Sequence, residues 1–106
     1  METVENQAVV GTPTGLHTRP LHKLVSAYPK DKGEVVVTFR NLDHPVPETY
    51  GKYDHNGQSI MDMLLLAASK GHRILIKVQA ATRELANEIA IFYKQLIESD
   101  LDAVAA

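Results

Sequence analysis

Apolar and polar residues recur along the chain at two spacings, and each spacing predicts a different kind of element. Alternating apolar and polar residues, or short β-branched runs, are typical of strands, whereas apolar residues three and four positions apart line one side of a helix. Strand-like segments lie at about 5–11, 35–39 and 74–78, and helix-like segments lie at about 18–28, 60–69 and 83–98. The pattern therefore predicts short strands that alternate with helices.

The first predicted helix follows a turn and has one apolar stripe. Its apolar residues recur at i, i+3, i+4 and i+7, which is typical of a helix packed on a flat partner. They are Leu21, Leu24, Val25 and Tyr28. Thr18 can cap this helix, and Pro29 ends it because the residue before a proline disfavours helical geometry.

The last predicted helix has the same kind of stripe. Thr82 can cap its first turn. Its apolar positions recur at i, i+4, i+7 and i+11, and they are Leu85, Ile89, Phe92 and Leu96. We expect these four residues to face the core.

The segment 41–58 is the least regular part of the chain. Two prolines and two glycines interrupt it, so no long element fits there. Tyr50 and Tyr53 are its candidates for a third, short strand or a hairpin arm. We therefore describe the segment as an irregular insert.

A short helix is predicted directly after this insert. Ser59 has Asp62 at the third following position, which is a capping-box spacing in its Asp form. The helix is expected to run from Ile60 to about Ser69 and to end before Gly71, where glycine suits a left-handed residue.

These elements together predict an α+β fold. Their order is strand, helix, strand, short strand, helix, strand, helix. Each helix has one apolar stripe to bury, and a single sheet can receive all of them on one face. We therefore expect an open-faced sandwich.

Composition fits one compact domain and narrows the function. The chain has 106 residues, of which 44% are hydrophobic, and no shift in composition marks a second domain. We expect a single domain over residues 1–106, with the insert at about 41–58 and a frayed tail from about residue 99. The formal net charge of −2 provides no basic field for a nucleic-acid partner.

Cysteine usage and the first residues bear on the compartment. The chain has no cysteine, so neither disulfides nor thiolate chemistry are expected. The start from Met1 to Glu5 lacks the basic and then apolar profile of a signal peptide, and no apolar run is long enough to span a bilayer. We therefore expect a cytoplasmic protein without membrane insertion.

The strongest chemical signal is the hexapeptide Gly15-Leu16-His17-Thr18-Arg19-Pro20 at the start of the first predicted helix. Gly15 lets the backbone turn, and Pro20 is tolerated in a first helical turn, where N–H groups lack intrahelical partners. These N–H groups and the helix dipole favour an anion beside His17, and Arg19 adds a guanidinium that binds phosphate oxygens. Neutral imidazole is also nucleophilic near pH 7. The pattern predicts a phosphohistidine site.

This hexapeptide, followed further along by Ser59-Ile60-Met61 at the start of a short helix, resembles the HPr family. HPr is the histidine-containing phosphocarrier of the bacterial phosphoenolpyruvate-dependent phosphotransferase system. The resemblance covers roughly residues 5–98 and implies a βαββαβα sandwich, with a mainly antiparallel sheet covered on one face by helices. It also implies that enzyme I phosphorylates His17 and that the phosphoryl group passes to an EIIA-type acceptor. Thr18 and Arg19 are the expected phosphate-binding residues.

The same match assigns candidates on the short helix. Ser59 falls where a regulatory serine kinase phosphorylates some family members. The positions at which partners dock correspond to Ile60, Met61 and Leu64. On structural grounds alone, Ser59 is a helix cap and the three apolar residues are equally candidates for the core.

Two features depart from the usual family pattern, and a third indicates a branch of the family. The connection from Phe39 to Ser59 is several residues longer than is usual. Asp62 stands where relatives often have a basic or small residue. The run Met63–Gly71 looks more like the nitrogen-related branch than the sugar-transport branch, and both branches stay open.

The candidate residues also have plainer interpretations. A histidine near a helix start is commonly a polar cap, and Arg19 can be a solvated helix residue. His22 does not share a helical face with His17 for metal binding. His44 and His55 flank the insert without further clear ligands, so no metal site is expected.

Three hypotheses follow. The preferred one is a monomeric phosphoryl carrier between enzyme I and an EIIA-type protein, with no cofactor and no enzymatic activity of its own. The alternative is a regulatory binding module of the same fold, acting through Ser59 and the surface of Ile60, Met61 and Leu64. The third, a small metal-dependent hydrolase, lacks a cluster of histidines and carboxylates at ligand spacing.

Overall fold

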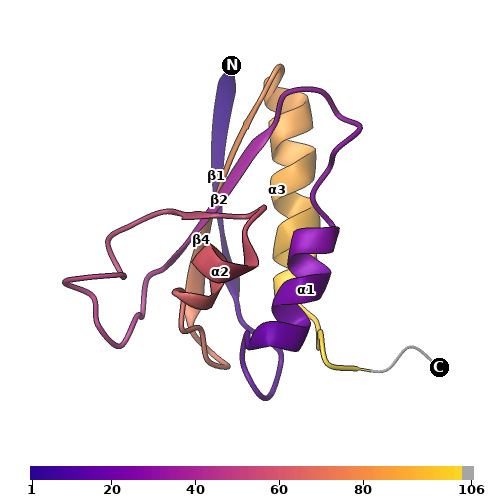
Figure 1. Ribbon diagram of the computed structural model, residues 1–106. Coiled ribbons are helices and arrows are strands. Elements are labelled where there is room, and N and C mark those ends of the chain that lie inside the picture. The colour runs from indigo at the N-terminus through magenta and orange to yellow at the C-terminus, as the bar shows by residue number, and fades with distance from the viewer. Residues whose placement is uncertain (104–106) are drawn as a thin grey trace.

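The computed structural model describes residues 1–103, which form one sheet and three helices (Figure 1). The strands are β1 (Glu2–Val9), β2 (Val36–Asn41), β3 (His55–Asn56) and β4 (Arg73–Ala80). The helices are α1 (Thr18–Ser26), α2 (Ile60–Leu64) and α3 (Arg83–Glu98). The predicted order of elements is confirmed. In this part of the chain, no helix combines the length and the apolar character that crossing a membrane requires.

The sheet is antiparallel throughout, with the order β1-β4-β2-β3. In its centre, β4 pairs Val78 with Val4 of β1 and Ile76 with Phe39 of β2. Every second residue of β4 is buried, as expected for a strand with one face on a core. Helix α3 packs on β1 and β4, and α1 contacts both α2 and α3. The fold is the expected open-faced sandwich.

The core shows that α3 is rotated relative to the predicted stripe. Tyr93 is fully buried, and its ring meets Phe39 edge to face at 5.3 Å between centroids. Phe92 is 47% exposed, so its predicted core position is wrong. The buried residues of this helix are Ala86, Ile89, Ala90, Tyr93 and Ile97. Two alanines let the helix lie close to the sheet, which the pattern of large apolar residues did not indicate.

Helix α2 is shorter than predicted, because it ends at Leu64 instead of continuing to about Ser69. Ala67 has a φ of +46°, which interrupts helical geometry. The carbonyl oxygen of Ala68 accepts the N–H of Leu16 at 2.8 Å. The residues after α2 therefore bond to the loop before α1 and cannot continue the helix.

The insert forms turns and contributes only Asn41, at the end of β2, and the two residues of β3 to the sheet. Tyr50 and Tyr53 lie in turns and are 41% and 55% exposed, so their predicted strand position is wrong. The N–H of Gly51 donates to the carbonyl oxygen of Val46, which closes one of these turns. In Figure 1 the segment between β2 and β3 extends away from the helices.

Residues 99–103 do not form the predicted frayed tail. Leu101 is only 3% exposed and belongs to the hydrophobic core. Its N–H donates to Oγ1 of buried Thr12 at 3.0 Å. A buried leucine and a buried hydrogen bond hold this segment in place, while residues 104–106 lie outside the described part of the chain.

Candidate functional site

The loop between β1 and α1 presents His17 at the start of the helix. Gly15 has a φ of +80°, and its N–H donates to the carbonyl oxygen of Thr12 at 2.9 Å. A Cβ on Gly15 would lie 2.6 Å from the carbonyl oxygen of Ala68. Only glycine lets the loop close against the segment that follows α2.

His17 is the N-cap residue of α1. Its backbone is extended, with φ −84° and ψ −172°, and its carbonyl oxygen accepts the N–H of Leu21 at 3.0 Å. The prediction that Thr18 caps the helix is wrong, because Thr18 is already the first helical residue. The side chains of Thr18 and Arg19 are exposed beside His17.

The N-terminus of α1 is open to an anion. No side chain caps it, and its first turn contains no acidic residue. Within residues 1–103, the N–H groups of Thr18 and Arg19 donate to no protein acceptor, as is usual for a first helical turn. These groups and the positive end of the helix dipole attract negative charge. A cation such as Arg19 is unfavourable there for the helix alone, and a bound anion would offset that cost.

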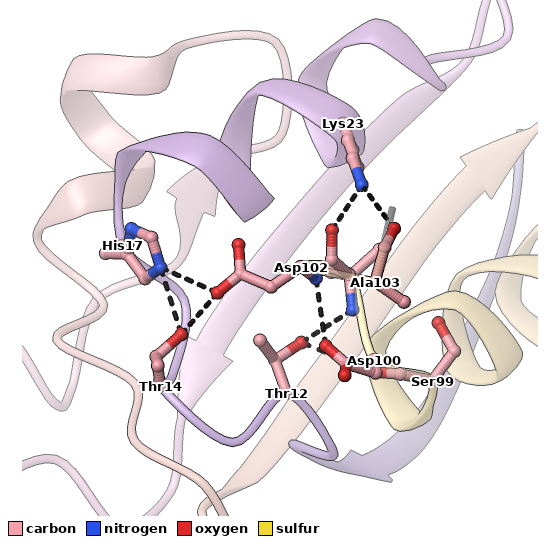
Figure 2. A network of polar contacts seen from close by, with 9 residues as sticks. Thr12, Thr14, His17, Lys23, Ser99, Asp100, Asp102 and Ala103 are labelled. Carbon is pink, nitrogen blue, oxygen red and sulfur yellow. Dashed lines mark hydrogen bonds and ion pairs between the residues drawn. The ribbon is translucent and has the colours of Figure 1, made fainter. Parts of the chain in front are cut away.

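The two ring nitrogens of His17 have different surroundings. Its side chain is 48% exposed, and its Nε2 lies 3.0 Å from Oδ2 of Asp102 and 3.0 Å from Oγ1 of Thr14 (Figure 2). An ionised carboxylate only accepts hydrogen bonds, so we assign the ring hydrogen to Nε2. Nδ1 then carries the lone pair, and no side chain or backbone group among the described residues hydrogen bonds to it.

Hydrogen bonds favour the ionised form of Asp102. The hydroxyl of Thr14 donates to the carboxylate and lowers the pKa of Asp102 below its ordinary value of 3.8. The bond from His17 lowers that pKa further, and the positive charge of Arg19 also lowers it. Burial raises the pKa, but by less than the hydrogen bonds lower it. An anionic Asp102 at neutral pH is consistent with a hydrogen on Nε2 of His17.

The C-terminal segment 99–103 brings Asp102 to this site. The segment runs back past the start of α1, and Figure 2 shows the Asp102 side chain directed at the imidazole of His17. Oγ1 of Thr12 accepts the N–H of Leu101, which fixes the residue before Asp102. The site therefore combines the loop before α1, the start of α1 and the end of the described chain.

The predicted docking residues lie on α2, beside α1. Ser59 is the N-cap of α2, and its Oγ accepts the N–H of Asp62 at 3.2 Å, so its predicted capping role is confirmed. Met61 is 78% exposed and Leu64 is 39% exposed. Ile60 is half-buried. The contact between α1 and α2 brings this apolar surface close to the helix that begins at His17.

His44 and His55 are buried, and both ring nitrogens of each are hydrogen bonded within the protein. The Nε2 of buried His44 donates to the carbonyl oxygen of Leu65 at 2.7 Å, and its Nδ1 accepts the N–H of Val46 at 2.9 Å. Buried His55 bonds to Asp62 at 2.7 Å, and its other nitrogen bonds to a backbone carbonyl. No group of three or more possible metal-ligating residues lies together in the described range 1–103.

Sequence reasoning missed two residues of the site, Thr14 and Asp102. Asp102 lies 85 positions from His17 along the chain, in a segment without helical or strand periodicity. No signal in the sequence indicates that contact. Thr14 lies three positions before His17, and a hydroxyl residue at that distance from a candidate histidine is a usable signal.

Comparisons with known proteins agree with this geometry. A family model described as the PTS HPr component phosphorylation site matches residues 4–94. The phosphocarrier protein HPr from Bacillus anthracis str. Ames is similar at a TM-score of 0.63 and 25% sequence identity, over 90% of this chain and 100% of that chain. A histidine-containing phosphocarrier protein from Mycoplasma shares the fold at a TM-score of 0.60 and 24% identity, over 88% and 90% of the two chains. No curated protein sequence matches the chain significantly.

Proposed function

The chain belongs to the HPr family, and from this premise we propose that the Nδ1 atom of His17 carries the phosphoryl group. Membership confirms the resemblance noted in the sequence and the expected open-faced α+β fold. As a member of this family, the protein is a phosphocarrier of the phosphotransferase system. The residue and the atom that carry the group are our proposal.

The observation that carries this proposal is the difference between the two nitrogens of the His17 ring. Nε2 is hydrogen bonded to Asp102 and Thr14, which leaves the lone pair on Nδ1. The ring is half exposed at the open N-terminus of α1. A neutral imidazole nitrogen with a free lone pair is a nucleophile suited to attack phosphorus.

The start of α1 supplies the charge stabilisation for the phosphoryl group. The N–H groups of Thr18 and Arg19 can donate to phosphate oxygens, and the Arg19 guanidinium can add a bidentate contact. Phosphoryl transfer depends mainly on positioning and on charge stabilisation. These two residues therefore bind the group that His17 carries.

The partners we propose are enzyme I as donor and an EIIA-type protein as acceptor. Family membership implies interaction with phosphotransferase enzymes. A carrier has to keep its phosphoryl group until a partner completes the reacting geometry, so the protein acts as a carrier and not as an enzyme. The exposed Met61 and Leu64, with Ile60, form a docking surface beside α1. We further propose a monomeric, single-domain, cytoplasmic protein that works without a cofactor.

Labelling with phosphoenolpyruvate, magnesium and a bacterial enzyme I tests this function. We expect intact mass measurement to show one added phosphoryl group, and we expect acid to remove it. His17→Ala should abolish the labelling. His22→Ala is the matched control, because His22 is an exposed histidine on the same helix, and it should be labelled normally.

Two results would count against the proposal. Labelling that persists undiminished in His17→Ala would assign the phosphoryl group to another residue. Loss of function in Ser59→Ala, with His17→Ala fully functional, would instead favour the regulatory module. Comparing enzyme I proteins from the sugar-transport and nitrogen-related branches would also indicate which branch loads this carrier.

A further inference from the structure

We propose that Asp102 is a positioning residue for phosphoryl transfer. Its carboxylate fixes the ring hydrogen of His17 on Nε2 and stabilises the positive charge that the ring acquires when Nδ1 is phosphorylated. This inference rests on the proposed role of His17. Asp102 lies outside the residues 4–94 that the family model matches, so the family match does not assign it a role.

The chain holds Asp102 through contacts on both sides of it. Lys23 of α1 donates from its Nζ to the carbonyl oxygens of Leu101 and Ala103. Leu101 is buried in the core and donates its N–H to Thr12. Figure 2 shows these contacts around the segment and the Asp102 carboxylate projecting from it to His17. The position of the carboxylate therefore depends on core packing and on α1, and not on the His17 contact alone.

Phosphoryl transfer to His17 creates a positive charge on the ring that the Asp102 carboxylate can stabilise. The lone pair of Nδ1 forms a bond to phosphorus while the bond from phosphorus to the donor breaks, and the electron pair of that bond leaves with the donor. His17 keeps its hydrogen on Nε2, so the neutral ring becomes positively charged. A carboxylate that accepts this hydrogen holds the reactive tautomer and stabilises the charge, as the aspartate does in a Ser-His-Asp triad. Asp102 is placed to do both.

The carboxylate acts on the side of the ring away from the phosphoryl group. Its contact is to Nε2, and Figure 2 shows the other ring nitrogen directed away from Asp102. Oδ1 of Asp102 is buried and hydrogen bonds to no other group in residues 1–103. The negative charge of Asp102 therefore lies beside Nε2 of the ring, and Nδ1 lies on the other side of the ring.

The first test measures the tautomer of His17 without any phosphorylation. In ¹⁵N-labelled full-length protein at neutral pH, we expect long-range ¹H–¹⁵N spectra of the ring to show a protonated Nε2 and an unprotonated Nδ1. In Asp102→Ala, the two nitrogens should shift toward the average of two exchanging tautomers. Asp100→Asn is the control, because it removes a neighbouring charge and keeps an oxygen that can accept the N–H of Asp102.

The second test measures the initial rate of phosphorylation by enzyme I. Asp102→Asn keeps a carbonyl acceptor for Nε2–H but removes the charge, and we expect the rate to fall about tenfold, equivalent to about 1.4 kcal/mol in the barrier. Asp102→Ala should fall at least as far, Asp102→Glu should recover part of the rate, and Asp100→Asn should react like the wild-type protein. Circular dichroism and urea unfolding would show whether each variant keeps the fold.

The outcomes separate this inference from the proposed function. Unchanged ring signals together with an unchanged rate in Asp102→Ala would overturn the role of Asp102 while leaving His17 as the acceptor. A rate that falls equally in Asp102→Asn and Asp100→Asn would also overturn it, because general charge would then be the cause. Wild-type protein that no enzyme I labels would contradict the role of His17, and the tautomer spectra would still decide whether Asp102 orders the ring.

Discussion

The N-termini of α1 and α2 belong to neighbouring helices but are built in opposite ways. At α2, Ser59 accepts the N–H of Asp62, and the Asp62 carboxylate in the first turn accepts the N–H of Asn56 at 2.7 Å. At α1, no side chain caps the helix and the first turn contains no acid. The start of α2 has a side-chain cap and an acidic residue in its first turn, whereas the start of α1 has neither.

This difference indicates that an anion is favoured at the start of α1 and disfavoured at the start of α2. A phosphate on His17, as we propose, would meet free N–H groups at the start of α1 and the positive charge of Arg19. A phosphate on Ser59 would meet the carboxylate of Asp62 in the same helical turn, and like charges repel. The structure gives Ser59 a capping role, and its phosphorylation stays a prediction from the family resemblance.

The largest expected effect comes from breaking the close contact between the loop before α1 and the segment that follows α2. We expect Gly15→Ala to lower the free energy of unfolding by about 3 kcal/mol, because it adds left-handed strain and a clash with the carbonyl oxygen of Ala68. The matched control is Gly33→Ala, which has a φ of +79° but no neighbour within 4 Å. Its cost should be about 1 kcal/mol. Urea unfolding measures both, and equal losses would show that the close contact does not matter.

The uncapped N-terminus of α1 can be given an acidic residue without disrupting the fold. Thr18→Glu places a carboxylate in the first turn, where it competes with the phosphoryl group for the N–H groups and Arg19. We expect the initial rate of phosphorylation to fall about tenfold and the free energy of unfolding to rise by about 0.3–1 kcal/mol. Thr18→Gln, which has the same size without the charge, is the control. Equal rates in the two variants would argue against an anion site at α1.

Smaller changes in stability are expected when the side chain of each N-cap residue, Ser59 of α2 or His17 of α1, is removed. Ser59→Ala should cost about 1 kcal/mol of unfolding free energy, because it removes the hydrogen bond that caps α2. His17→Ala should change stability by less than about 0.5 kcal/mol, because its exposed side chain does not cap α1. Urea unfolding of the two variants measures the difference. A larger loss in His17→Ala would mean that the start of α1 depends on this ring for its structure.

Acid is expected to weaken slightly the hydrogen bonds of two carboxylates, Asp62 at the start of α2 and Asp102 beside the start of α1. Burial raises the pKa of Asp62, but hydrogen bonds from Asn56 and His55 outweigh it, so that pKa lies below its ordinary value of 3.8. The pKa of Asp102 is lowered as well. A carboxyl with a lowered pKa contributes stability above its unfolded value and loses it as the pH falls. Urea unfolding below about pH 5 should show declining stability, and Asp62→Asn should reduce the decline. Rising stability in acid would contradict this sign.

Features encoded by neighbouring residues were predictable from the sequence. The turn at Gly15, the helix that follows His17 and the caps at Ser59 and Thr82 all lie where the local pattern indicates. The hydrophobic alternation of β4 is also confirmed. In each case the physical cause acts within a few residues: backbone freedom, a side-chain cap or a strand with one buried face.

Features that depend on distant contacts were not predictable. Residues 65–69 have the composition of a helix, but the backbone of Ala68 is needed by the loop before α1. Phe92 and Tyr93 are both large and aromatic, and the close approach of α3 to the sheet decides which of them is buried. Asp102 reaches His17 because Leu101 packs in the core and Lys23 binds the backbone on both sides of Asp102. The chemistry of the site was thus predictable from the sequence, but the carboxylate partner of His17 was not.

The most direct test of the central claim is to determine which nitrogen of which histidine carries phosphorus. Phosphorylated protein labelled with ¹⁵N would be studied by NMR, using the coupling between ³¹P and the ring nitrogens. We predict a single phosphohistidine at His17, bonded through Nδ1 and still protonated at Nε2, where Asp102 accepts the hydrogen. Phosphorus on Nε2 of His17, or on any other residue, would contradict the account.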